Sequence, residues 1–161
     1  MTSSRILVAL LFAAPLAQAE ARPDIARAQA LVIDATNAFR RDEGRAAVTR
    51  NEKLEETARD FARYMARTGT FDHQADGLTP ADRAQRHGYR WCRIAENIAY
   101  QFDSRGYSAE VLARELVAGW KNSAGHRRNM LERDVVHIAV AIARSDRNGY
   151  YYAVQMLGRT C

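Results

Sequence analysis

The stretch VHIAVAIARSDRNGYYYAVQML, residues 136–157, decides the fold. Over residues 136–143 bulky Val and Ile side chains alternate with a histidine and three alanines. This alternation is typical of a strand with one bulky face and one small face. Asp146-Arg147-Asn148-Gly149 then contains the Asn-Gly pair that favours a tight turn. Residues 150–157 resume an apolar run, so the stretch predicts a β-hairpin.

Helical periodicity dominates the chain before this hairpin. Apolar residues recur at helical spacing over residues 24–41, 51–68 and 108–120, and Asn51 and Ser108 are suitable N-caps. A shorter helix is predicted from Thr79-Pro80 to about residue 87. Residues 94–100 form a third, shorter strand candidate. Helices followed by a hairpin predict an α+β fold, with helices packed on a small antiparallel sheet.

Composition excludes several classes of protein. The chain has 161 residues, of which 47% are apolar and 27% charged, which is typical of one globular domain rather than a disordered, collagenous or coiled-coil chain. The formal net charge is +5, but arginines are interleaved with acidic residues along the chain. A nucleic-acid binder would more often carry a basic stripe or arm, so we expect no nucleic-acid partner. A solvated surface is the favoured interpretation, and an anionic partner in the cell envelope is the alternative.

The N-terminus and the two cysteines indicate an exported protein. Arg5, an apolar run over residues 6–14 and Ala17-Gln18-Ala19 are typical of a secretory signal peptide, residues 1–19. An uncleaved anchor is the alternative. We therefore expect a single mature domain over residues 20–161, secreted or periplasmic, without a transmembrane segment after cleavage. Two cysteines in an exported chain favour a Cys92–Cys161 disulfide over two free thiols.

Three polar residues stand out as candidates for chemistry: His73 in a predicted loop, Glu96 on one face of the third strand, and His126. Two imidazoles and a carboxylate can bind a transition metal or transfer protons. A carboxylate on an apolar strand face must be paired, so Glu96 as the structural partner of one histidine is the alternative. His87 is interpreted as a cation at a helix C-terminus, and His137 as structural.

Ser123 raises the question of a Ser–His hydrolase because His126 lies three residues later. The favoured interpretation is that Ser123 is the N-cap of a short helix, with its hydroxyl bonded to a backbone N–H. Nucleotide-binding, zinc-peptidase and nucleophile-elbow motifs are absent from the sequence. No catalytic residue is assigned from the sequence.

Several ordered motifs resemble the CAP superfamily, which includes cysteine-rich secretory proteins, antigen 5 and pathogenesis-related proteins, and in particular its bacterial exported branch. The resemblance runs from about Ala30 to Gly158. It is carried by five segments: Phe71-Asp72-His73, residues 76–83 followed by Gly88-Tyr89, Glu96-Asn97-Ile98-Ala99, residues 120–131, and residues 151–158.

The resemblance implies a three-layer α-β-α sandwich and a cleft in which His73, Glu96 and His126 meet. In the family such residues can hold a divalent metal, often zinc. Many members carry a second glutamate where this chain has Ser123, so any metal is expected to bind weakly. We expect Asn97, Ser123 and Gln155 to support the cleft.

Three functions remain open from the resemblance. The first is a binding domain whose cleft takes a metal or a small ligand. The second is a metal- or histidine-dependent hydrolase, similar to a peptidase. The third is binding of a lipid or sterol. The expected partner is an extracellular or envelope ligand: a lipid, a peptide or a protein.

Overall fold

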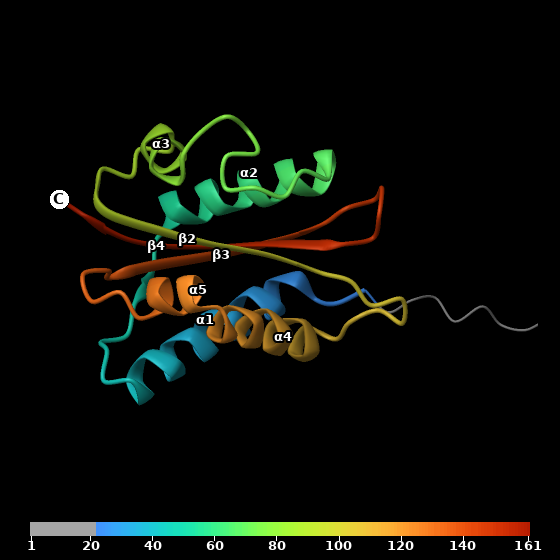
Figure 1. Cartoon of the computed structure of the whole chain (residues 1–161), viewed down its shortest axis with the longest axis horizontal. Coiled ribbons are helices and arrows are strands. Elements are labelled where there is room, and N and C mark those ends of the chain that lie inside the picture. The colour runs from blue at the N-terminus through green and yellow to red at the C-terminus, as the bar shows by residue number, and fades with distance from the viewer. Residues whose placement is uncertain (1–21) are drawn as a thin grey trace, which may run out of the picture.

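The computed structural model describes residues 22–161, so the predicted signal peptide lies outside the described residues. These residues form three layers: α2 and α3 cover one face of a sheet, and α1, α4 and α5 cover the other (Figure 1). The predicted α-β-α sandwich is confirmed. The elements are α1 (Ile25–Asp42), β1 (Thr49–Arg50), α2 (Glu52–Thr68), α3 (Pro80–Arg86), β2 (Trp91–Gln101), α4 (Ala109–Asn122), α5 (Ala124–Met130), β3 (His137–Arg144) and β4 (Tyr151–Thr160).

The sheet has four strands in the order β1-β3-β4-β2. Strands β3 and β4 form the predicted antiparallel hairpin, and β2 adds antiparallel to β4 as an edge strand. The short β1, which pairs parallel to β3, was not predicted because two residues show no periodicity. Strand β2 also extends beyond the predicted residues 94–100 at both ends.

Local capping explains where the helices begin and end. The Asn51 side chain accepts a hydrogen bond from the Leu54 N–H at the start of α2, and Gly69 ends that helix with a φ of 78°. Thr79 and Asp82 form a reciprocal capping box at the start of α3. The predicted helices are therefore confirmed to within one or two residues.

The alternation in β3 builds two cores. Ile138, Val140 and Ile142 pack with α1 and α4, whereas Ala139 and Ala141 lie under α2. The small face lets α2 approach the sheet closely, and both faces of the strand are buried. Strand β3 of the hairpin therefore packs against both helical layers.

The predicted Cys92–Cys161 disulfide is confirmed. Its Cα atoms lie 4.9 Å apart, and it joins the start of β2 to the residue after β4 across a sequence separation of 69.

His137 has the predicted structural role: its Nδ1 lies 2.9 Å from the Tyr89 hydroxyl. Burial raises the pKa of Tyr89 to about 12. Within residues 22–161, no helix combines the length and apolarity needed to cross a membrane.

Candidate functional site at the edge strand

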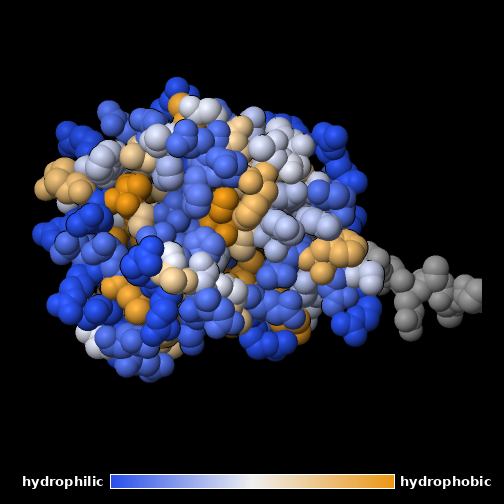
Figure 2. Space-filling view, viewed as in Figure 1, coloured by the Kyte–Doolittle hydropathy of each residue, from blue (hydrophilic) through white to orange (hydrophobic). Residues whose placement is uncertain are grey.

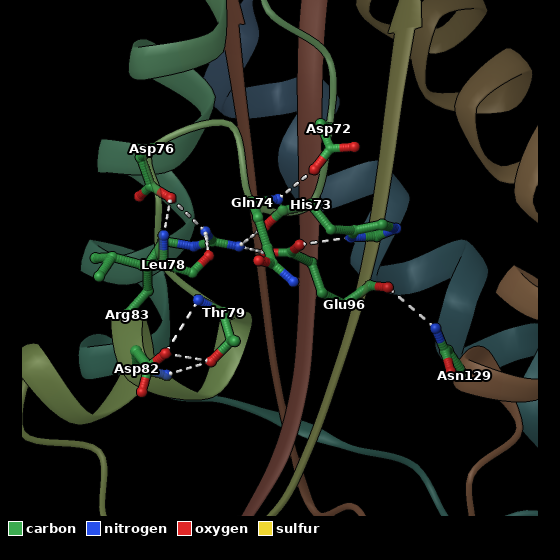
Figure 3. Close-up of polar contacts among 10 residues, drawn as sticks. All are labelled: Asp72, His73, Gln74, Asp76, Leu78, Thr79, Asp82, Arg83, Glu96 and Asn129. Atoms are coloured by element: carbon green, nitrogen blue, oxygen red, sulfur yellow. Dashed lines mark hydrogen bonds and ion pairs between the residues drawn. The ribbon is translucent and has the colours of Figure 1, made fainter.

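Glu96 on β2 is the centre of the candidate site. Its side chain is only 1% exposed, and each of its oxygens has a partner. Oε1 lies 2.7 Å from Nδ1 of His73, and Oε2 accepts a hydrogen bond of 2.8 Å from Nη2 of Arg83. Figure 3 shows the carboxylate between the two, with Arg83 on one side and His73 on the other. The buried carboxylate is therefore paired on both oxygens, as its burial requires.

Arg83 is the partner that sequence reasoning missed. It comes from α3, its side chain is 5% exposed, and its guanidinium also contacts Asp76 at 2.8 Å. Two further bonds reach the backbone carbonyls of Leu78 and His73, and the guanidinium stacks on the Phe61 ring at 3.5 Å. Arg83 Nε has no hydrogen-bond partner among the described residues. Arg83 thus holds the loop that carries His73 against β2.

His73 lies in the loop after α2, and its side chain is 48% exposed. The hydrogen bond to Glu96 raises the pKa of His73 above its ordinary value, against the opposing effect of burial. Because Nδ1 is bonded to the carboxylate, Nε2 is the ring nitrogen left for a ligand. A half-exposed imidazole with one nitrogen fixed and one free is suited to binding or proton transfer.

His126 lies in the first turn of α5 and is half-buried. Burial, followed by the charge of His73, lowers the pKa of His126. A backbone contact places His126 beside β2, at the residue that follows Glu96. No hydrogen bond joins the His126 ring to Glu96 in the described part of the chain; its backbone carbonyl instead accepts from Asn97 at 3.2 Å.

Side-chain amides hold α5 against the edge strand. Asn129 donates to the Glu96 carbonyl at 3.0 Å and to the Asn97 side chain at 2.9 Å. Asn97 donates to Gln155 at 2.9 Å, and Gln155 donates to the Thr36 hydroxyl at 3.0 Å. Asn97 and Gln155 therefore lie in one network that connects α1, the sheet and α5. This network fixes the helix that carries His126.

Ser123 occupies the predicted N-cap position of α5, but the predicted hydrogen bond is wrong. Its hydroxyl makes no capping bond, although the Arg127 N–H does bond to the Ser123 carbonyl at 2.8 Å. The cap therefore uses the backbone alone. No hydrogen bond joins Ser123 to His126 among the residues described, so the geometry of an activated serine is missing.

The site offers a metal fewer protein ligands than the family resemblance implied. Among residues 22–161, no group of three or more His, Cys, Asp or Glu side chains is arranged to hold a metal ion. Glu96 is 1% exposed and both of its oxygens are bonded, so it is placed to orient His73. A carboxylate bonded to the far nitrogen of a histidine is, however, the usual second partner of a metal-binding imidazole. Two imidazoles, one of them backed by Glu96, remain available.

Comparison with known proteins identifies a family that the chain resembles in sequence. Residues 33–157 match the CAP family, described as the cysteine-rich secretory protein family. The chain is 30% identical to the uncharacterized protein YkwD of Bacillus subtilis over 129 residues, which are 80% of this chain and 46% of YkwD. It therefore spans about half the length of this curated relative.

Solved structures agree with this match. An outer surface protein of Borrelia burgdorferi has a TM-score of 0.75 at 16% identity, covering 89% of this chain and 100% of that one, and shows the fold alone. An extracellular SCP-domain protein of Bacillus anthracis has a TM-score of 0.67 at 25% identity, covering 83% of this chain and 40% of that one. With the family match spanning most of the described residues, the chain belongs to the CAP, or cysteine-rich secretory protein, family.

Proposed function

We propose that this chain is an exported CAP-family binding domain whose His73 and His126 imidazoles take a divalent metal of the zinc class, weakly. One observation carries the proposal: Glu96 is bonded to Nδ1 of His73 and leaves Nε2 as the free ring nitrogen. The extracellular SCP-domain neighbour supports export to the periplasm or the medium. The ligand that follows is an extracellular or envelope molecule.

The chemistry of the side chains supports this role. The carboxylate of Glu96 fixes the His73 tautomer and makes its ring a better electron-pair donor. Burial favours the neutral form of His126, which is the form that binds a metal. A bound divalent ion would supply positive charge and open positions for an oxygen-bearing ligand. Two protein ligands instead of three or four account for weak binding.

The pH dependence follows from His73. Because its pKa is raised, His73 takes up a proton at mildly acidic pH and loses the lone pair on Nε2. A proton and a metal compete for that nitrogen, so acidification should release the metal. The dependence distinguishes imidazole ligands from carboxylate ligands, which stay ionised in this range.

Titration calorimetry with zinc chloride tests the proposal. At about pH 7.5 the wild-type protein should bind one zinc, and at about pH 5.5 the binding should be at least about tenfold weaker. His73→Ala and His126→Ala should each lower the affinity at least about tenfold, whereas His87→Ala, at the end of α3, should have no effect. Equal binding at both pH values, or unchanged binding in the double variant, would overturn the proposal.

A second candidate function, binding of an acyl chain, is supported by a concavity of about 340 Å³ between α1 and α4. Its apolar lining residues include Leu31, Ala35, Val117 and Ala118. Its charged lining residues are Glu110, Arg114 and Lys121. An apolar trough beside a cation suits a fatty carboxylate. Ala118→Trp should abolish binding of a fluorescent fatty acid, and Ala47→Trp, at an exposed site outside the concavity, should not. Failure of the wild type to bind would exclude this candidate.

A further inference from the structure

A second concavity, of about 410 Å³, lies beside α5 and is rich in arginine. It is lined by Arg45, Arg127, Arg128, Leu131, Glu132 and Arg133. These residues come from two segments, the loop after α1 and the C-terminal half of α5 with the turn that follows. Figure 2 shows strongly hydrophilic side chains around a small apolar spot in this region, at the lower left of the view. Four guanidinium groups face one carboxylate here.

The concavity has a rigid wall because Arg40 holds its two segments together. The Arg40 side chain is buried, and it donates to the carbonyls of Ala46 at 2.8 Å, Met130 at 2.7 Å and Glu132 at 2.9 Å. Arg45 Nε adds a bond of 3.1 Å to the Leu131 carbonyl. The guanidinium groups of the lining residues are thus carried by a preformed backbone, which lowers the entropy lost on binding.

The positive charge here is not neutralised by the protein itself. Arg127 pairs with Glu43 at 2.7 Å, but Arg45, Arg128 and Arg133 have no acidic partner within 4.0 Å among the described residues. Like charges gathered in this way repel one another, and an anion relieves that repulsion.

Glu132 offsets only one of the four positive charges that line the concavity. Its Oε1 accepts hydrogen bonds from the backbone N–H groups of Arg133 at 2.8 Å and Asp134 at 3.3 Å, so it closes the turn after α5. Arg45 uses its Nε for the Leu131 carbonyl. Its Nη atoms and the guanidinium groups of Arg128 and Arg133 have no acidic partner in the described chain and can donate to a ligand. Guanidinium forks match the oxygens of a phosphate group in geometry and charge.

We propose that this concavity binds a phosphate-bearing ligand through Arg45, Arg128 and Arg133. The ligand chemistry is a phosphate ester, either a soluble one or the headgroup of an anionic lipid. The volume exceeds that of one phosphate ion and leaves space for an ester substituent beside Leu131. This site is separate from the His73–Glu96 pair, since neither of those residues is among those that line the concavity.

Two probes distinguish the sources. Pyrophosphate is titrated by calorimetry at about 50 mM salt, and co-sedimentation is measured with vesicles of phosphatidylglycerol against vesicles of phosphatidylcholine. Binding of pyrophosphate shows that a soluble phosphate group is enough, and binding to phosphatidylglycerol vesicles alone identifies a lipid headgroup. Both results support the site, and binding should weaken sharply at about 0.5 M salt.

The double variant Arg128→Gln/Arg133→Gln should lower the affinity at least about tenfold. The control Arg59→Gln/Arg63→Gln removes the same charge from exposed positions on α2, across the sheet, and should stay within about twofold of the wild type. Thermal unfolding of all three proteins checks that each is folded. Absence of binding to both probes at low salt, or an equal loss in both double variants, would overturn the proposal.

Discussion

Nδ1 of His73 lies 2.7 Å from Oε1 of Glu96, so an exposed imidazole is held by a carboxylate that is itself buried. The exposed partner comes from a loop and the buried one from an edge strand. Arg83 bonds to the other oxygen of Glu96 and to the His73 carbonyl, which fixes both partners at once. The position and protonation of His73 therefore depend on two buried side chains.

The pKa of His73 should depend on the carboxylate of Glu96. In the wild type, nuclear magnetic resonance should show His73 titrating above the ordinary histidine pKa of 6.5. In Glu96→Gln the pKa of His73 should fall, because a neutral amide no longer stabilises the imidazolium. Glu56→Gln, which removes an exposed acid on α2, should leave this titration unchanged. An unchanged His73 pKa in Glu96→Gln would contradict the assigned cause.

The free energy of unfolding should depend on pH through the same histidines. A raised folded-state pKa means that the contribution of His73 is fully present below about pH 6.5 and is lost as the pH rises through its folded-state pKa. The lowered pKa of His126 acts in the opposite sense, since protonation of this residue at acidic pH favours unfolding. In urea unfolding, His73→Ala should therefore lose the fall in stability with rising pH. His126→Ala should lose the fall in stability at acidic pH. Identical pH profiles in all three proteins would contradict both assignments.

Arg83 should be a major source of stability. Arg83→Met leaves Glu96 as a buried charge with a single partner, and unfolding in urea should show a loss of about 3–5 kcal/mol. The double variant Arg83→Met/Glu96→Leu should recover much of this loss, because it removes both buried charges. Arg86→Met, at an exposed position on the same helix, should change stability by less than about 0.5 kcal/mol. A loss below about 1 kcal/mol for Arg83→Met would contradict this role.

Gly158 should tolerate no side chain. A Cβ there would lie 2.8 Å from the hydroxyl of Tyr89 and 2.9 Å from its Cε1, and that ring is buried and bonded to His137. Gly158→Ala should therefore lower the unfolding free energy by about 1–3 kcal/mol. Gly119→Ala, on α4 with nothing within 4 Å of its Cβ, should instead raise it by about 0.5–1 kcal/mol. Equal effects in the two variants would show that steric overlap is not the cause.

The disulfide should matter for folding because it closes a long loop. Cys92→Ser/Cys161→Ser removes a link across a sequence separation of 69, and the expected loss is about 2–5 kcal/mol in urea unfolding. The wild type in reducing agent should match the double variant. A wild type that unfolds at the same urea concentration with and without reductant would contradict this role.

Much of the fold was predictable because it rests on local signals. The alternation in β3, the turn before β4 and the caps at Asn51 and Thr79 each act over a few residues, and each predicted element is present. The two-residue β1 was not predictable, since its pairing with β3 depends on tertiary packing. The three layers were expected from the family resemblance rather than from periodicity.

The site was predictable only in part. A carboxylate on an apolar strand face indicated that Glu96 needs a partner, but not that Arg83 supplies the second one, because the two are brought together by the packing of α3 on β2. Arg83 lies in one of the motifs that carried the resemblance, seven residues after Asp76, and this was the available signal. The missing side-chain bond of Ser123 was not predictable, since capping preference is a tendency that the backbone satisfied without it.

The most direct test of the account is to locate zinc in crystals of the protein by anomalous diffraction at the zinc edge. We expect one zinc bonded to Nε2 of His73 and to the ring of His126, with Glu96 still bonded to Nδ1 of His73 and to Arg83. Zinc bonded to the carboxylate oxygens of Glu96, or crystals soaked at neutral pH that show no zinc at either histidine, would contradict it.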